Sequence, residues 1–267
     1  MLKSDKCAGS LDFSEKNQTP MVTIITAVFN GERFIEETIL SVINQTYRNI
    51  EYIVIDGGST DSTVNIIKKY ENYISYWVSE KDGGISDAFN KGILASSGDY
   101  INFQGDGDGF VADDVIERLM KSVDPRKVML ISGRIERVSD KGEHLYFSKK
   151  QKKFYKSSLL FRMSLPHQGL FTHRNLFIDY GLFDVKNTFC MDYEHLLRAY
   201  KKFPEVVTKD IVVARWRADG IGNKRELEVL AEYDLIKRKN MIAKEIILSL
   251  INQWILFKFH VKKILSR

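Results

Sequence analysis

Two aspartates one residue apart form the part of the sequence with the clearest chemistry. Asp106 and Asp108 lie in the segment Gly105–Gly109, among three glycines that let the backbone turn tightly. One or two carboxylates of this kind hold a hard divalent cation, which keeps its other positions for water and phosphate oxygens. Such a cation stabilises negative charge on a departing diphosphate. The segment therefore predicts a metal–phosphate site with Asp106 and Asp108 as metal ligands.

Three other interpretations of this segment compete with a metal–phosphate site. A dinucleotide-binding loop needs a third glycine where the chain has Phe110. An EF-hand needs a calcium ligand at Phe110 and a glycine at Val111, although Glu117 stands at its twelfth position. A plain polar turn is the structural alternative, because Asp and Gly are common turn residues. The position of the segment after a buried strand favours a ligand site over a plain turn.

Carboxylates also follow two earlier apolar runs. Asp56 precedes Gly57–Gly58 and can accept hydrogen bonds from a nucleobase or a sugar, or it can simply start the next helix. Asp82 and Asp87 flank a second pair of glycines. Lys91 follows Asp87 by one helical turn and can meet a phosphate as a point charge. An ordinary i,i+4 ion pair on a helix surface is the alternative for Asp87 and Lys91.

The elements that must position these residues alternate regularly in the first hundred residues. Apolar runs at 22–26, 52–55, 74–78 and 100–103 predict strands, and the spacing within 34–42, 59–70 and 86–95 predicts helices. This alternation is typical of an α/β fold with a mainly parallel sheet. Ligands of such sheets bind outside the carboxyl ends of the strands, where Ala27, Phe29 and Asn30 join the carboxylates.

The pattern is less regular after residue 112. Helices are expected at 113–122 and 191–202 and from 227 to the end, and strands at 128–132 and 211–214. Residues 1–18 are polar and aperiodic, and we expect them to be disordered. We expect one domain over 19–223 and a basic, amphipathic helical extension over 224–267.

Composition and charge narrow the class of protein. The 267 residues are 44% hydrophobic and 28% charged, enough for a packed core. The net charge of +5 is too small to indicate nucleic-acid binding, and all of it comes from the ten basic and five acidic side chains of 224–267. Two cysteines favour a reducing compartment over a disulfide framework. No apolar stretch reaches the roughly 20 residues of a membrane span, so we expect a cytoplasmic protein.

The ordered motifs together resemble family 2 glycosyltransferases, which have the GT-A fold. The resemblance extends from about Thr19 to Gly222, and within the family it is strongest to bacterial enzymes of exopolysaccharide, capsule or O-antigen assembly. The matching segments are Thr26–Asn30, Ser41–Tyr47, Ile55–Asp61, Ser79–Gly92, Ser97–Tyr100, Pro166–Phe171, Tyr180–Asp184 and Met191–Arg198.

This resemblance implies transfer of a sugar from a nucleotide sugar to an acceptor hydroxyl, with inversion at the anomeric carbon. The catalytic base of the family corresponds to Asp192, with Glu194 as the substitute. The base-contacting aspartate corresponds to Asp56, and the metal-binding Asp-x-Asp to Asp106 and Asp108. Many relatives have Asn-x-Asp-Asp here, so the glycines of this loop leave open which aspartate binds metal and which binds the ribose.

The remaining implied site residues lie around the donor. Ala27, Phe29, Asn30, Asp82, Asp87, Lys91 and Asp106 are expected to contact the nucleotide sugar. His167 and Gln168 match a recurrent segment near the acceptor, for which the sequence gives no chemical role. His195 is expected on a helix surface, and Cys190 lacks partners for nucleophilic catalysis.

The implied cofactor is Mn²⁺ or Mg²⁺, and the implied donor is a UDP-sugar in preference to a GDP- or dTDP-sugar. The acceptor is expected to be a glycan, linked to a lipid diphosphate. The competing class is a non-catalytic nucleotide- or glycan-binding protein that keeps the fold.

The C-terminal helix has an apolar stripe with Trp254, Phe257 and several lysines at its far end. Such a helix can lie in a membrane interface, which would place the protein peripherally at the inner face of the cell membrane. Packing on the catalytic core or on a second subunit, as in a homodimer, is the equally weighted alternative.

Overall fold

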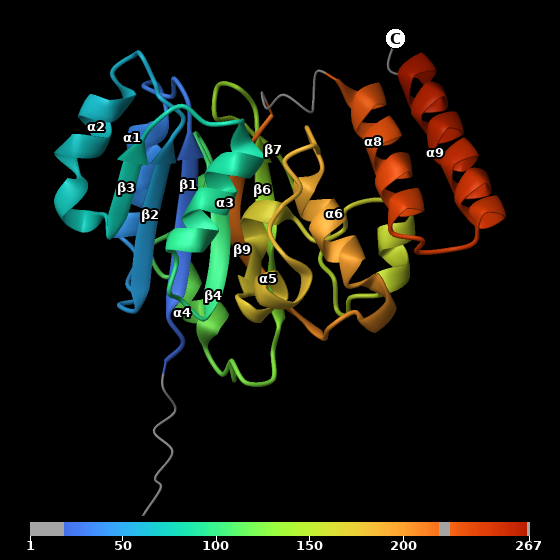
Figure 1. Ribbon diagram of the computed structural model, residues 1–267, viewed down its shortest axis with the longest axis horizontal. Helices are drawn as coiled ribbons and strands as arrows, with labels where there is room; N and C mark the ends of the chain where they lie inside the picture. Colours follow the sequence, from blue (N-terminus) through green and yellow to red (C-terminus); the bar gives the residue numbers. More distant parts are fainter. Residues whose placement is uncertain (1–18, 219–224, 266–267) are drawn as a thin grey trace, which may run out of the picture.

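The computed structural model describes residues 19–218 and 225–265. The segment 1–18 and the expected boundary at residue 223 lie outside these ranges. Among the described residues, the strands form one sheet with helices on both faces, and two long helices, α8 and α9, stand beyond one end of it (Figure 1). The expected α/β fold is therefore confirmed.

The sheet has a parallel part and a mixed part. In the parallel part, the strands lie in the order β3 (Tyr76–Ser79), β2 (Ile50–Asp56), β1 (Val22–Val28) and β4 (Tyr100–Gly105). The order continues through β8 (Leu170–His173), β6 (Leu130–Val138), β9 (Val206–Arg217) and β5 (Gly109–Phe110), and β7 (His144–Phe147) pairs with β6. β8 is antiparallel to both of its neighbours, whereas β6 and β9 are parallel.

The central strands are apolar on both sides because helices cover both faces. All seven residues of β1 are buried, and successive side chains enter opposite cores. Ile24 packs with α1 (Ile35–Ile43), α2 (Thr63–Lys69) and α4 (Val115–Met120), whereas Ile25 packs with α3 (Ile85–Ala95). The buried residues of α1 fall at i, i+3, i+4 and i+7, the spacing of one helix face.

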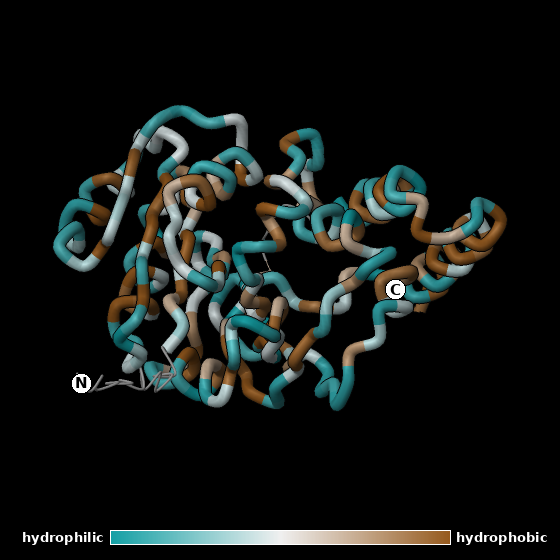
Figure 2. Tube along the Cα trace, turned by 60° about the horizontal axis from the view of Figure 1, so that its bottom comes forward, coloured by the Kyte–Doolittle hydropathy of each residue, from teal (hydrophilic) through white to brown (hydrophobic). Residues whose placement is uncertain are grey.

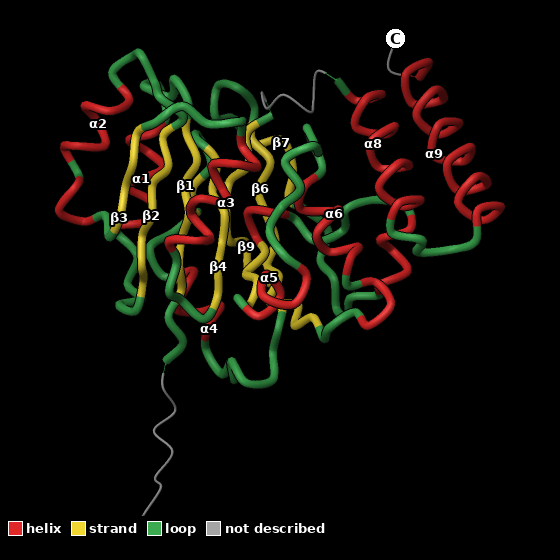
Figure 3. Tube along the Cα trace, in the orientation of Figure 1, coloured by secondary structure: helices red, strands yellow, loops and turns green. Residues whose placement is uncertain are grey.

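The second half of the sheet differs from expectation. β6 and β9 are longer than the runs at 128–132 and 211–214, and β7 and β8 were not expected (Figure 3). Charged side chains such as Arg134 and Glu136 interrupt the apolar run of β6, although its hydrogen-bonded ladder continues. All four residues of β7 are exposed, so no burial pattern marks them.

The helices after β8 build a third core at the end of the sheet. α5 (Asn175–Tyr180) precedes α6 (Met191–Arg198), and α8 (Glu226–Lys239) and α9 (Glu245–Leu265) follow β9. Tyr193 of α6, Ile236 of α8 and Leu248 of α9 share one apolar cluster. The chain is not one helix from 227 onward, because it turns at Met241, whose φ is +46°. None of the described helices is both long and apolar enough to cross a bilayer.

Candidate functional site

The loops after β1, β2, β3 and β4 meet at one edge of the sheet. A Cβ atom added to Gly31, after β1, would lie 2.4 Å from Oδ2 of Asp106, after β4. One added to Gly57, after β2, would lie 2.8 Å from Oδ2 of Asp82, after β3. A larger residue at either position would displace the carboxylate that lies directly against the glycine backbone. The structure thus brings together the strand-end residues that the sequence predicted would meet.

Asn30 joins the first two of these loops. Its φ of +51° turns the chain after β1. Its backbone N–H donates to Oγ of Ser59 at 2.7 Å, and its Oδ1 accepts the N–H of Thr60 at 2.9 Å. Ala27 is buried in the strand, whereas the ring of Phe29 is 64% exposed beside these loops. An exposed ring in this position can stack on a flat ligand such as a nucleobase.

Asp56 is fully buried and accepts hydrogen bonds from its own loop and from β3. Oδ2 accepts from the N–H of Gly58 at 3.1 Å, the N–H of Ser59 at 2.9 Å and Oγ of Ser79 at 2.6 Å, and Oδ1 accepts from Oγ of Ser59. Three of these donors meet Oδ2 and one meets Oδ1, which keeps one lone pair. Asp56 therefore orders the loop, and its contact with a nucleobase stays a prediction.

The loop after β3 is also held by its own carboxylates. Asp82 accepts the N–H of Gly84 at 2.8 Å, and Asp87 accepts the N–H of Gly83 at 2.9 Å. Nζ of Lys91 lies 2.7 Å from Glu80 and 3.9 Å from Asp87. The hydrogen bond to Glu80 raises the pKa of Lys91. Lys91 is therefore charged but already paired, and its binding of phosphate stays a prediction.

Asp108 lies deepest in the loop after β4. Its Oδ2 accepts from Nε2 of Gln168 at 2.9 Å and from the N–H of Gly105 at 3.2 Å, and its Oδ1 accepts the N–H of Arg217 at 3.3 Å. Burial raises the pKa of this carboxyl to about 6, although the three donors oppose the shift. Asp108 is thus fixed by three segments, whereas Asp106 lies against the loop after β1.

The loop needs its middle glycine, which explains one departure from the family pattern. Gly107 has a φ of +81°, and a Cβ there would lie 2.5 Å from Cδ of Arg217. The guanidinium of Arg217 stacks over the ring of Phe34 at 3.7 Å from its centroid. The end of β9 therefore packs directly on the Asp-x-Asp loop and places a cation beside it.

Asp106 and Asp108 fit a divalent cation whose coordination shell is completed by oxygen atoms of the substrate. The described residues contain no group of three or more His, Cys, Asp or Glu side chains arranged to hold a metal ion. Two carboxylates from one loop suffice where phosphate and water provide the other oxygens. Asp106 and Asp108, beside Gly31 and Arg217, are such a pair.

Asp192 lies in the first turn of α6, with its side chain 18% exposed. Its Oδ1 accepts the N–H of Tyr193 at 2.8 Å, and its Oδ2 lies 3.7 Å from Nδ1 of His167. His167 belongs to the short turn His167–Gly169, whose next residue, Gln168, bonds to Asp108. One turn thus contacts both the expected catalytic base and the expected metal ligand.

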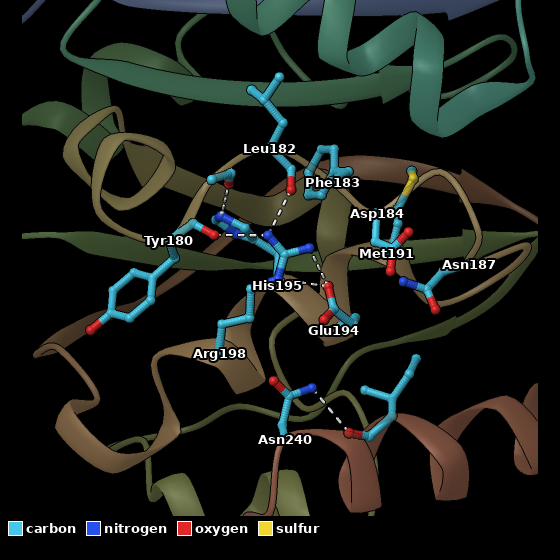
Figure 4. Close-up of polar contacts among 12 residues, drawn as sticks. Tyr180, Leu182, Phe183, Asp184, Asn187, Met191, Glu194, His195, Arg198 and Asn240 are labelled. Atoms are coloured by element: carbon cyan, nitrogen blue, oxygen red, sulfur yellow. Dashed lines mark hydrogen bonds and ion pairs between the residues drawn. The ribbon is translucent and has the colours of Figure 1, made fainter.

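Glu194, the expected substitute for the base, is occupied elsewhere. It is buried and bound by Nε and Nη2 of Arg198 (Figure 4). Nζ of Lys239 lies 3.4 Å from the other oxygen of Glu194. Arg198 also donates to the carbonyls of Tyr180 and Leu182. Glu194 is therefore a structural ion-pair partner, because each of its oxygens is paired with a cation.

The expectation that His195 lies on the helix surface is wrong. Its side chain is 2% exposed, and its ring stacks on Phe177 with centroids 4.5 Å apart. Nε2 lies 2.9 Å from the carbonyl oxygen of Gly181. The packing of α5 against α6 covers this side of α6, a contact between elements that helical spacing alone does not reveal.

Sequence reasoning missed three residues that hold the site. Gln168 was noticed without a role, Ser79 binds Asp56, and Glu232 of α8 accepts the N–H groups of Phe189 and Cys190. The signal for Gln168 was its place in a matching motif. Ser79 likewise begins a matching motif, whereas Glu232 lies outside the matching segments and acts across a gap of 42 residues.

Comparison with known proteins agrees with this arrangement. Residues 23–184 match the sequence family described as Glycosyl transferase family 2. An uncharacterised glycosyltransferase of Mycobacterium tuberculosis (strain ATCC 25618 / H37Rv) is 34% identical over 213 residues, which cover 78% of this chain and 79% of the relative. One of Rickettsia typhi is 29% identical over 230 residues, covering 83% and 72%.

Solved structures of similar fold bind nucleotides. Staphylococcus aureus TarS 1–349 in complex with UDP-GlcNAc aligns with a TM-score of 0.70 at 16% identity, covering 88% of this chain and 71% of that one. The Pyrobaculum calidifontis mannosyltransferase PcManGT, in complex with GDP-Man and Mn²⁺, aligns with a TM-score of 0.66 at 18% identity, covering 89% and 72%. At these identities the likeness shows the fold, which is GT-A.

Proposed function

The chain belongs to glycosyl transferase family 2, and we propose that it transfers a sugar from a nucleotide-sugar donor to a hydroxyl group of a glycan acceptor, with inversion at the anomeric carbon. The carrier that we propose is UDP, the nucleotide of the TarS complex. The proposed acceptor is a glycan linked to a lipid diphosphate, used in the synthesis of bacterial surface polysaccharide such as capsule or lipopolysaccharide.

In the proposed reaction, Asp192 accepts the proton of the acceptor hydroxyl while that oxygen forms a bond to C1 of the sugar. The bond from C1 to the diphosphate breaks on the opposite face, and its electron pair leaves with the nucleoside diphosphate. A positioned base of this kind contributes about 10²–10⁴-fold to the rate. Phe29, Asn30, Asp56, Asp82, Asp87 and Lys91 are proposed to line the donor site.

We propose that Asp106 and Asp108 hold Mn²⁺ or Mg²⁺. When bound, such an ion neutralises charge on the diphosphate. Gln168 and the backbone N–H of Arg217 would keep the Asp108 carboxylate in place, and the nearby guanidinium of Arg217 adds positive charge beside the leaving group.

One observation carries this proposal. Carboxylates from the loops after β3 and β4 lie against the glycine backbones of the loops after β2 and β1, at the single edge where an open parallel sheet binds its ligand. His167 lies near Asp192 and the next residue, Gln168, donates to Asp108, so one turn connects the proposed base with the proposed diphosphate site.

Calorimetric titration of UDP, GDP and dTDP, with and without Mn²⁺, tests the donor site. We expect metal-dependent binding of one nucleotide, lost in Asp106→Asn. Asp113→Asn removes the same charge from an exposed residue close to the loop in sequence and serves as the control. No binding of any of the three nucleotides by the wild type would count against the proposal.

Turnover separates an enzyme from a non-catalytic binding protein. Release of nucleoside diphosphate from UDP-GlcNAc, UDP-glucose and GDP-mannose would be followed with a bacterial lipid extract as the source of acceptor. We expect release with one donor and a loss of about 10²-fold or more in Asp192→Ala. Nucleotide binding without any Asp192-dependent release would favour the binding protein.

We also propose that the protein works peripherally at the inner face of the cell membrane, through one side of α9. Large apolar side chains recur there at intervals of three and four residues and are exposed, whereas Leu248 faces the core. They are Ile247, Leu250, Trp254, Phe257, Val261 and Ile264. Figures 1 and 2 show α9 at the outer end of the molecule, beyond α8.

The charges of α9 favour an anionic lipid surface over a second copy of the chain. Lys258 and Lys262 lie beside Phe257, Val261 and Leu265 on the exposed surface of α9. The one acidic residue of α9 is Glu245 at its first position, where it pairs with Arg238 of α8, so a second α9 would offer these lysines little negative charge. Apolar insertion with flanking lysines suits anionic headgroups, at about 1 kcal/mol per lysine. The basic end of α9 lies at the same edge of the molecule as the carboxyl ends of β1–β4 (Figure 1).

Vesicle sedimentation tests the membrane contact without any need for turnover. We expect binding to vesicles of phosphatidylcholine with phosphatidylglycerol, weaker binding to phosphatidylcholine alone, and loss in Leu250→Ser/Trp254→Ser. Ile178→Ser, an equally exposed apolar residue on α5, is the control. The membrane proposal would be wrong if the wild type bound neither kind of vesicle. If the wild type were then a dimer and the double variant a monomer, a second copy of the chain would cover α9 instead.

A further inference from the structure

The imidazole of His167 is held by an aromatic cluster beneath the site. Its ring stacks on Phe103 with centroids 5.2 Å apart and planes 7° from parallel. Phe89 and Phe183 lie at 5.8 and 6.4 Å from the same ring at steep angles. This packing leaves the ring little freedom to rotate, so the direction of its two nitrogens is fixed by the core.

The two nitrogens have different surroundings. Nδ1 lies 3.7 Å from Oδ2 of Asp192. Nε2 is buried and has no hydrogen-bond partner within the described ranges 19–218 and 225–265. A buried N–H without a partner is costly, whereas an N–H directed at a carboxylate is favourable. The proton of a neutral ring therefore belongs on Nδ1.

Burial lowers the pKa of His167, and the nearby Asp192 carboxylate opposes this only in part. The ring is therefore neutral at pH 7 and above, with one N–H to donate. A separation of 3.7 Å is too long for a hydrogen bond. Catalytic hydrogen bonds are often long without substrate and tighten when it binds.

We propose that His167 is a positioning residue for the base, whose Nδ1–H donates to Oδ2 of Asp192 and holds the carboxylate toward the acceptor hydroxyl. The proposal rests on the proposed function, in which Asp192 takes the proton. The N–H of Tyr193 already holds Oδ1. Each carboxylate oxygen has a second lone pair, so one remains for the proton of the acceptor.

The turn His167–Gly169 also connects the proposed base with the proposed metal ligand. The carbonyl of Gln168 accepts hydrogen bonds from Asn102 and Gln104 of β4, and its side chain donates to Asp108. Because His167 and Gln168 are consecutive, the spacing between Asp192 and Asp108 is fixed by one turn anchored to β4. In this proposal, His167 and Gln168, to which the sequence assigned no chemical role, set the distance between the base and the leaving group.

Imidazole tautomers can be measured directly, independently of activity. Long-range ¹H–¹⁵N spectra of the full chain, labelled at histidine nitrogens and recorded at pH 8, identify the protonated nitrogen, and His167→Phe assigns the signal. We expect the proton on Nδ1. A proton on Nε2 would present a lone pair to Asp192, and the proposal would be wrong.

Two variants separate donation from packing, with whichever donor the wild type turns over. His167→Phe keeps the stacked ring without the N–H, and His167→Asn keeps an amide N–H near the position of Nδ1 without the ring. We expect kcat to fall about tenfold or more in the Phe variant, with the KM for donor unchanged, and to recover largely in the Asn variant. A packing role predicts the reverse order, and that order, or equal activities, would overturn the proposal.

If the wild type turns over no donor at all, the proposed function fails, while the tautomer measurement still decides whether His167 donates to Asp192. The two failures are therefore distinguishable.

Discussion

The carboxylate of Glu232, on α8, accepts the backbone N–H of Cys190 at 2.8 Å, two residues before Asp192. It also accepts the N–H groups of Phe189 and Thr188, at 3.0 and 3.2 Å. A helix from the expected C-terminal extension thus holds the segment that leads into α6. We therefore propose that α8 belongs to the catalytic unit, and that α9 alone is an appendage.

Glu232→Ala would leave these N–H groups without their acceptor. We expect the free energy of unfolding to fall by about 1–3 kcal/mol, because buried donors lose their partner. Turnover should fall by about tenfold or more, since small displacements of a catalytic group are costly. Glu228→Ala is the control, because Glu228 pairs only with the exposed Arg225. Urea unfolding and initial rates measure both effects, and equal stabilities of the two variants would contradict the assignment.

Gly107→Ala should weaken nucleotide binding more than it weakens the fold. The residue combines a φ of +81° with a Cβ position 2.5 Å from Cδ of Arg217. Gly142 has a φ of +80° with open space around it, so Gly142→Ala carries the backbone strain alone, about 1–3 kcal/mol. Calorimetric titration of the nucleotide that binds the wild type compares the two variants. Equal affinities would show that the contact with Arg217 does not shape the loop.

His195 should make the protein less stable in acid. Burial lowers its pKa from 6.5 to about 4, so the unfolded chain binds a proton in this range and the folded chain does not. Its contribution, about 3 kcal/mol, is complete above pH 6.5 and is lost as the pH falls toward 4. Urea unfolding across this range should show a shallower pH dependence in His195→Gln than in the wild type. If the free energy of unfolding depended on pH equally in the two proteins, His195 would not be the source of the acid instability.

Arg198→Ala should be strongly destabilising. It removes the two hydrogen bonds to one carboxylate oxygen of Glu194, whose side chain is 1% exposed, and the donor to the carbonyls of Tyr180 and Leu182. Breaking a buried ion pair costs about 3–5 kcal/mol, and Nζ of Lys239, 3.4 Å from the other oxygen of Glu194, offsets part of this loss. Arg118→Ala, which breaks an exposed i,i+4 pair with Asp114, should cost less than about 1 kcal/mol. Melting temperatures of the two variants test the contrast, and similar losses would contradict it.

Much of the parallel half of the sheet could be predicted from local runs of apolar residues. The apolar runs of β1, β2 and β4 are buried on both faces, so they stand out in the sequence without any alternation. β6 and β9 were predicted only in part, because charged residues interrupt their apolar runs, and β7 was not predicted because its four exposed residues show no burial pattern. Their pairing depends on neighbours that are distant in the chain.

The sequence by itself determined that the polar residues after the parallel strands would gather at one edge of the sheet. A carboxylate or glycine pair at the end of each parallel strand must meet the others, because parallel strands place their carboxyl ends at one edge. Asp56, Asp82, Asp106 and Asn30 follow this rule, since Asp82 lies against Gly57, Asp106 against Gly31, and Asn30 accepts the N–H of Thr60 in the loop after Asp56.

Only the tertiary structure decided which polar groups are paired and which face the site. Glu194 and Asp192 lie two residues apart on α6, so their side chains point to different sides of the helix. One meets Arg198 in the core and the other lies near His167. The partners of Asp108 and Cys190 come from Gln168 and Glu232, which are 60 and 42 residues away. Contacts of this range depend on how the elements pack, and no local pattern of residue types encodes them.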